Sequence, residues 1–406
     1  MLTCVSMTTE RFRTFGAKAL LLIGLLYASV GHTEDRDLRA FQHGLDILPL
    51  PNGQYVSIWS SVVSEKLQLS NNDKEWSHDV YMASFSNVST RLSPELLISA
   101  PDHTAQEPAS SAISRDGHIM VTMEDAYQAK HELMQSYAVF DTQFKSIAPY
   151  QQVAFDGGHS GHVAAVDNLF VIFFSEGWVD GGGVDDLGSG DDVLLKTYNS
   201  IGKELGLLSV SVGDNHRDWW PILAGSQHVA LLLWQRFVDD KTDAQLMYSI
   251  YDPIKNTLLK QPVVLRDDVQ YYTYDVQFLP TVNRFLITGT KENNTGFAYL
   301  IDEQGSVVSA LSMLPPFVRE AQPAIIDYQN EMEPHKVVER VVYPIAPSGL
   351  VVLDVNKTSI SIKQRLYDPY LWQYIGTDGV FLDEQTVYFH TLSQYGLKEM
   401  RWHIQK

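Results

Sequence analysis

Four residues in the sequence have the side chains needed to move a proton next to a carboxylate: His159, His216, Arg217 and Tyr272. Histidine and tyrosine can serve as acid or base near neutral pH, and a cation can hold the carboxylate while the neighbouring proton leaves. This chemistry would suit β-elimination on a uronic-acid polysaccharide. The alternative is structural, in which these polar residues hydrogen-bond the starts of strands.

A second group of residues suits binding rather than chemistry: His162, Trp219, Arg319 and Tyr370. Sugar rings can stack on aromatic faces, and histidine and arginine can hydrogen-bond sugar hydroxyls. Trp219 and Tyr370 belong to short aromatic clusters at 219–221 and 370–372. Such clusters serve equally well as core residues that pack one sheet against the next, so both interpretations stay open.

An acidic, glycine-rich loop at 176–192 contains the carboxylates of Asp180, Asp185, Asp186 and Asp191. Ca²⁺ takes six to eight oxygen ligands, and flexible Gly/Asp loops can supply them. The spacing departs from that of the helix-loop-helix calcium motif, so a solvated hairpin loop is the alternative. His159, His162 and His216 could also supply three imidazoles to a metal.

The elements that must position these residues are short strands separated by Gly, Asp and Asn turns. One unit recurs: an apolar strand with an aromatic end, a polar loop, a second strand, a turn and a final strand. It is clearest at 55–61 with 79–85, at 169–175 with 192–198 and at 230–234 with 245–251. Weaker copies lie at 119–140, 284–301, 337–355 and 380–402.

Seven units of about fifty residues match the size of a four-stranded blade in a β-propeller. We therefore predict an all-β fold, a β-propeller of seven four-stranded blades, with six or eight blades as alternatives. Leu38–Phe41 would complete the last blade and close the ring. A pair of β-sandwiches or a parallel β-helix explains the repeat less well. In a propeller every blade starts at one face beside the axis, so the candidate residues, which precede or begin blades, should converge there.

Two motifs resemble known families. The segment 173–183, followed by 191–206, resembles the blade repeat of exported bacterial propellers. Seven-bladed propeller polysaccharide lyases, such as those that act on ulvan, are similar in architecture and in their His/Tyr/Arg repertoire, which implies the elimination chemistry above. Ser114–His118 is similar to the sialidase Asp-box, but Met123 lies near the place of its closing Trp, so the motif does not support a sialidase.

The first 31 residues have the pattern of a secretory signal, with a basic segment, an apolar segment and small residues at 28–31. Only 15 uncharged residues run from Ala19 to Thr33, short of the roughly 20 that a membrane-spanning helix needs. We expect 32–406 to form a single, monomeric domain in the periplasm or outside the cell, with no membrane span after cleavage. Cys4, the only cysteine, would be lost with the signal, so thiol chemistry is excluded.

The charge of the chain excludes one class of partner. Thirty Lys and Arg against 49 Asp and Glu give a net charge of −19, whereas nucleic-acid binding needs a basic face. Three functions remain open: binding of a polymer, most simply a carbohydrate, or of a protein; a polysaccharide lyase; and a scaffold in the cell envelope.

Overall fold

The computed structural model describes residues 45–61, 79–87, 89–99, 106–125, 134–154, 158–179, 189–211, 216–237, 244–329, 337–369, 372, 377–393 and 396–404. The predicted signal at 1–31 and the predicted closing strand Leu38–Phe41 lie outside these residues. Within the described ranges, no helix has the length and apolar character needed to cross a membrane.

The described strands form six antiparallel sheets in which each strand pairs with its neighbours in the sequence. The first two sheets contain β1 (Leu45–Pro49), β2 (Tyr55–Ser61), β3 (Asp79–Phe85) and β4 (Leu96–Leu97), then β5 (Gln106–Ile113), β6 (His118–Asp125), β7 (Met134–Asp141) and β8 (Ser146–Ala154). The third contains β9 (His159–Val166), β10 (Leu169–Trp178), β11 (Ser189–Asn199) and β12 (Glu204–Ser211).

The fourth sheet has seven strands: β13 (Asp218–Gly225), β14 (Ala230–Phe237), β15 (Ala244–Asp252), β16 (Thr257–Leu279), β17 (Arg284–Lys291), β18 (Gly296–Ile301) and β19 (Val307–Leu314). The last two sheets contain β20 (Ala324–Gln329), β21 (Val337–Pro344), β22 (Leu350–Val355) and β23 (Ile360–Leu366), then β24 (Thr377–Phe381), β25 (Thr386–Ser393) and β26 (Gly396–His403).

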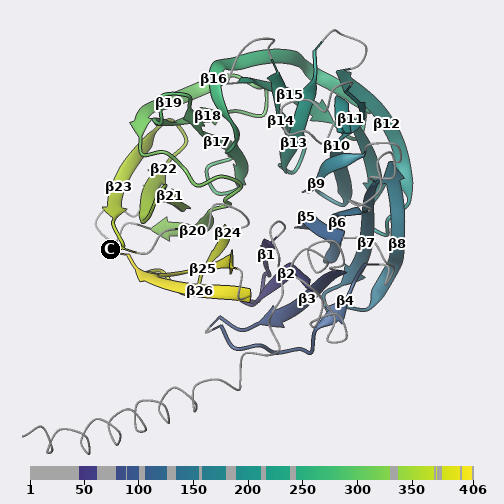
Figure 1. The fold of residues 1–406 in the computed structure, drawn as a ribbon, viewed down its shortest axis with the longest axis horizontal. Coiled ribbons are helices and arrows are strands. Elements are labelled where there is room, and N and C mark those ends of the chain that lie inside the picture. Colours follow the sequence, from purple (N-terminus) through teal and green to yellow (C-terminus); the bar gives the residue numbers. More distant parts are fainter. Residues whose placement is uncertain are drawn as a thin grey trace, which may run out of the picture.

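The sheets stand around a central axis as a closed ring, with the first strand of each sheet innermost (Figure 1). The inner strands β1, β5, β9 and β13 contact one another in that order, and β24 contacts both β20 and β1. This arrangement is a β-propeller and confirms the predicted all-β fold class.

Strand β16 explains why one sheet has seven strands. Residues 257–269 pair with β15, whereas residues 274–279 pair with β17. The same strand is therefore outermost for β13–β15 and innermost for β17–β19 (Figure 1). Dividing β16 at this point separates the described strands into the seven groups that the repeat predicts, whereas by hydrogen bonding the sheets number six.

Burial follows the place of each strand in its sheet. Residues 170–175 of the second strand β10 are all buried, because their side chains pack into core clusters on both faces of the sheet. The outer strand β12 instead alternates exposed and partly buried residues along most of its length. The core therefore lies between adjacent sheets, where for example the rings of Phe173 and Trp234 meet edge to face at 5.8 Å.

The first and last sheets close the ring by direct contacts. The backbone N–H of Ile47 donates to Oδ2 of Asp378 at 2.5 Å, and Oγ of Ser57 lies 3.2 Å from Nδ1 of His390. Burial lowers the pKa of His390 to about 3, so its ring is neutral at this contact. We call this junction the ring seam.

The Asp-box-like motif, Ser114–His118, forms the turn between β5 and β6. It therefore lies at the C-terminal end of the inner strand β5, away from the predicted site residues. Oγ of Ser114 donates to Asp116 at 2.6 Å, and Gly117 takes a left-handed φ of 86° that suits glycine. Asp116 also accepts a hydrogen bond from Ser200 of the next sheet. The motif therefore serves a structural role in linking two sheets.

Candidate functional site

Four residues near the starts of successive inner strands take an unusual backbone conformation. Ser160, Trp220, Tyr272 and Glu320 have φ values of 53°, 55°, 61° and 54°. A residue with a side chain occupies this left-handed region at an energetic cost, so the surrounding structure must hold it there. The pairing registers of β9, β13 and β16 shift at the first three positions, as expected for β-bulges.

A side chain from an earlier strand holds each of two of these residues. The backbone N–H of Ser160 donates to the Glu124 carboxylate at the end of β6. The N–H of Tyr272 donates to Oε1 of Gln235, on β14, at 3.1 Å. Each polar side chain lies on the strand after an inner strand, β6 after β5 or β14 after β13, and fixes the inner strand that comes next around the ring, β9 or the second half of β16.

The side chains at this end of the inner strands form a row of contacts. The ring centroids of His162 and Trp220 are 5.8 Å apart, and those of Trp220 and Tyr272 are 5.0 Å apart. The Arg319 guanidinium then lies over the Tyr272 ring, 4.4 Å from its centroid. We call His162, Trp220, Tyr272 and Arg319 the aromatic arc; three of the four are residues that the sequence predicts as site residues.

Two further predicted residues lie directly behind the aromatic arc. Nε1 of Trp219 donates to the Tyr272 hydroxyl at 2.9 Å, and the Arg217 guanidinium stacks over the Trp219 ring at 4.0 Å. Nε of Arg217 also donates to the Gly190 carbonyl at 2.8 Å. Trp219 has 0% exposure and Arg217 is buried. Both residues therefore support the arc, and Trp219 does not offer a face to a ligand.

His162 is held in one orientation by backbone carbonyls. Its Nδ1 lies 2.8 Å from the Ser160 carbonyl and 2.9 Å from the Pro221 carbonyl. Two acceptors at this distance require the proton to be on Nδ1. Burial lowers the pKa of His162, although both carbonyls and the Glu124 and Glu320 carboxylates act in the opposite direction. The side chain is thus a fixed wall of the site.

The remaining predicted residues are not brought into the arc by the contacts described. His216 is exposed and precedes Arg217, and His159 begins β9 with its backbone paired to Ser175. The side chain of His159 lies outside the described side chains, as does all of Tyr370. The interpretation of His159, His216, Arg217 and Tyr272 as catalytic, and the lyase chemistry with it, stays a prediction.

The predicted calcium loop lies mostly outside the described residues, because Asp180, Asp185 and Asp186 fall in the range 180–188. Asp191 is described and partly exposed at the start of β11. Among the side chains that the structure describes, no three His, Cys, Asp or Glu residues are grouped as metal ligands would be. Calcium binding by this loop stays a prediction.

Sequence reasoning missed two members of the site, Trp220 and Glu320. The cluster at 219–221 pointed to the right place, but the bulge decides which tryptophan is buried and which is partly exposed. Glu320 pairs with Arg319 at 2.7 Å. No sequence pattern predicts that a residue other than glycine will take a left-handed φ. The positions of Trp220 and Glu320 in the site could therefore not be predicted from the sequence.

The segment 315–323, which joins β19 to β20, crosses from one sheet to the next near the axis, and we call it the strap. The backbone N–H of Phe317 donates to Oγ1 of Thr290 at 2.9 Å, and that of Glu320 donates to the Tyr272 carbonyl at 3.1 Å. Further along, the N–H of Gln322 donates to the Thr377 carbonyl of β24 at 2.8 Å. The strap, which carries Arg319, is therefore attached to β16 and β17 by its first half and to β24 by its second half.

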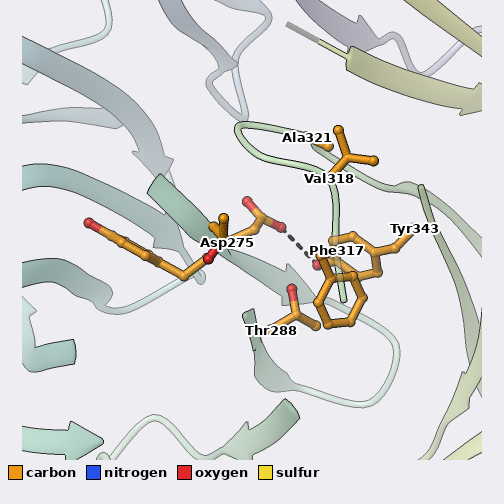
Figure 2. A pocket seen from close by; sticks show the side chains of 8 residues that line it. Asp275, Thr288, Phe317, Val318, Ala321 and Tyr343 are labelled. Atoms are coloured by element: carbon orange, nitrogen blue, oxygen red, sulfur yellow. Dashed lines mark hydrogen bonds between the residues drawn. The ribbon is translucent and has the colours of Figure 1, made fainter. Parts of the chain in front are cut away.

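A small pocket lies behind the strap (Figure 2). Phe317, Val318 and Ala321 of the strap line it, together with Asp275 and Tyr343. The Tyr343 hydroxyl donates to Oδ2 of Asp275 at 2.8 Å (Figure 2). The pocket has a volume of about 10 Å³, which is close to the minimum that holds one water molecule. It is therefore too small for an organic ligand.

Comparison with known proteins shows the fold alone. No family model matches the sequence, and no curated protein matches it. The BP39L lectin from Burkholderia pseudomallei is 12% identical with a TM-score of 0.52, and the match covers 90% of this chain and 96% of the lectin chain. A chain in the crystal structure of the mitotic checkpoint complex is 12% identical with a TM-score of 0.50, over 100% of this chain and 97% of that chain.

Proposed function

We propose that the protein binds a carbohydrate through the aromatic arc. The observation that carries this proposal is the pairing of Arg319 with Glu320 directly beside the Tyr272 ring. A guanidinium donates hydrogen bonds and a carboxylate accepts them, so the pair can satisfy the hydroxyls of a sugar. Tyr272 is itself only 8% exposed, so the partly exposed rings of Trp220 and Tyr271 beside it are the ones that suit the apolar C–H face of the same sugar.

The exposure of the arc agrees with this role. Arg319 has 36% of its side chain exposed, and both Trp220 and Tyr271 are partly exposed. Tyr271 extends the aromatic surface, because its ring lies 6.4 Å from that of Tyr272. Arg217 and Trp219 are buried behind and hold Tyr272 in place. The site therefore combines a partly exposed polar and aromatic surface with a rigid base.

The proposed location and ligand fit together. We propose that the chain is exported to the periplasm or beyond, where polysaccharides are abundant, and that the ligand is a polymer of sugars. One of the solved propellers with the same fold is a lectin. That likeness concerns the fold, and the proposal stands on the Arg319–Glu320 pair and its aromatic neighbours.

Replacement of the exposed arc residues is expected to weaken binding. Arg319→Ala and Trp220→Ala should each raise the Kd for a bound polysaccharide by about tenfold or more, because each removes a central contact worth about 1.4 kcal/mol or more. Binding to a panel of plant, algal and bacterial polysaccharides, measured by biolayer interferometry, identifies the ligand and then compares the variants.

Arg115→Ala is the matched control. Arg115 is 76% exposed and pairs with Asp167 at the opposite end of the inner strands, so its removal should leave the Kd unchanged. Equal affinity of Arg319→Ala and the original protein would contradict the proposal. Binding of a protein partner with no polysaccharide bound would also contradict it.

A further inference from the structure

Three carboxyl groups lie close to the strap near the axis of the ring; two of them are buried and that of Asp275 is partly buried. They are Asp46 on β1, Asp275 on β16 and Asp378 on β24, so they come from three different inner strands. Asp46 and Asp378 face each other across the ring seam, and Asp275 is near enough to Asp378 to interact electrostatically with it. We call these three residues the carboxyl trio.

The groups that hydrogen-bond the trio are neutral. Ser111 of β5 and Gln322 of the strap contact Asp46, and Tyr343 and Gln277 contact Asp275. Asp378 accepts hydrogen bonds from the backbone N–H groups of Ile47 and Gly379. Among the described residues, the groups that hydrogen-bond the trio are hydroxyls, side-chain amides and backbone N–H groups, whereas buried carboxylates are usually accompanied by cations.

The strap is attached to the same two strands that carry Asp46 and Asp378. Nε2 of Gln322 lies 3.4 Å from Oδ1 of Asp46, while the backbone N–H of Gln322 donates to the Thr377 carbonyl. Any movement that separates β1 from β24 therefore pulls these two anchors apart. Three residues earlier the strap carries Arg319, which lies over Tyr272.

We propose that ionisation of the carboxyl trio loosens the strap and thereby weakens ligand binding at the aromatic arc, so that the protein binds in mildly acidic solution and releases its ligand as the pH rises. The proposed effect on ligand binding rests on the proposed function, whereas the proposed movement of the strap does not.

The direction follows from the electrostatics of the trio. Burial raises the pKa of Asp46 and of Asp275 to about 6, and this effect outweighs the hydrogen bonds to the two carboxyl groups, including that from Gln322, which favour the ionised form. Burial also raises the pKa of Asp378 well above its usual value, with the Asp46 charge acting in the same direction. A raised pKa means that the folded protein favours the protonated form. The stabilisation is complete below the ordinary pKa of 3.8 and is lost as the pH rises through about 6, where the carboxylates begin to repel one another.

Two other described titratable groups near the trio, Tyr343 and His390, keep the same charge over this pH range. Burial keeps the Tyr343 hydroxyl protonated by raising its pKa well above the usual value. At the ring seam His390 stays neutral, because burial lowers its pKa to about 3. In the strap, Arg319 and Glu320 neutralise each other.

Hydrogen exchange of the full-length protein, measured by mass spectrometry without ligand, tests the movement. The strap amides of Phe317, Glu320 and Gln322 should lose protection by about tenfold or more between pH 5 and pH 8, after correction for intrinsic exchange, which corresponds to one pKa unit or more of coupling. Amides of β22 serve as the reference and should show no such change. Asp46→Asn should flatten the pH dependence of the strap.

Glu339→Gln is the matched control. Glu339 is also buried and has its pKa raised by burial to about 7, but it accepts a hydrogen bond from Val282 rather than contacting the strap. This variant should therefore keep the pH response of the strap. Asp275→Asn provides a second test if Asp46→Asn does not fold, and the original protein alone already tests the pH response.

Two results would overturn the inference. The first is hydrogen-exchange protection of the strap amides that stays constant, relative to β22, from pH 5 to pH 8. The second is a pH response of the strap in Asp46→Asn and Asp275→Asn that is as large as in the original protein. With a polysaccharide that binds, Kd should rise about tenfold over the same range and do so less in Asp46→Asn. A strap that responds to pH in a protein that binds no polysaccharide supports the movement and overturns the proposed function.

Discussion

Asp218→Ala is expected to lower the free energy of unfolding by about 3–5 kcal/mol, the usual cost of removing one partner from a buried ion pair. Asp218 has 0% of its side chain exposed and receives two hydrogen bonds from the Arg236 guanidinium, at 2.8 and 2.7 Å. Nε1 of Trp234 donates to it at 2.8 Å, and Ser211 is a further partner. The substitution deprives a largely buried guanidinium and a buried indole N–H of this acceptor.

Urea denaturation followed by tryptophan fluorescence measures this effect. Lys255→Ala is the control, because Lys255 pairs with Asp252 but is 68% exposed, and exposed ion pairs contribute about 0–1 kcal/mol. Equal destabilisation by the two substitutions would refute the assignment of Asp218 as the buried anchor. Since Asp218 lies between Arg217 and Trp219, the same substitution should also weaken the base of the aromatic arc.

Gly225→Ala is expected to lower the free energy of unfolding by about 3 kcal/mol or more, or to prevent folding, because it overpacks a junction made of backbone. A Cβ at Gly225 would lie 1.9 Å from the carbonyl oxygen of Ala165 and 2.8 Å from its carbonyl carbon. Gly225 ends β13 and Ala165 lies in β9, so the close approach joins the inner strands of two sheets. Relief requires the two sheets to separate.

The control for this prediction is Gly206→Ala in β12. There the nearest atom to the added Cβ is Nδ2 of Asn256 at 3.1 Å, in a side chain rather than in the backbone, so a shift of a few tenths of an ångström relieves the contact. Gly206→Ala should therefore change the stability by about 1 kcal/mol or less. The yield of folded protein and the midpoint of thermal unfolding compare the two variants. A Gly225→Ala protein as stable as Gly206→Ala would contradict the close packing.

The fold could be predicted in detail because the repeat is local. Strands β2 and β3 match the predicted ranges 55–61 and 79–85, and β10 contains the predicted range 169–175. Apolar runs bounded by Gly, Asp and Asn are sufficient to predict such strands. The continuity of β16 could not be predicted, because the aromatic run at 271–274 was interpreted as the start of a new strand rather than as part of a longer one.

The site could be predicted only in part. The rule that blades start at one face brought together His162, Tyr272 and Arg319 correctly, although they are far apart in the sequence. Trp220 and Glu320 were missed because their left-handed backbone depends on the surrounding fold. The Tyr272 bulge illustrates this, since the side chain of Gln235, 37 positions earlier in the sequence, holds it. The carboxyl trio was missed for the same reason, because its members meet only when the ring is closed.

The ring seam has a consequence for the order in which the protein assembles. Within each sheet the strands pair with their neighbours in the sequence, so each sheet closes only short loops. The contacts of the seam join residues 331 and 333 positions apart. Contacts of such long range carry the largest loop-closure entropy and form slowly. We therefore expect the sheets to form first and the ring to close last, so the interactions around Asp378 and His390 mature at the end of folding.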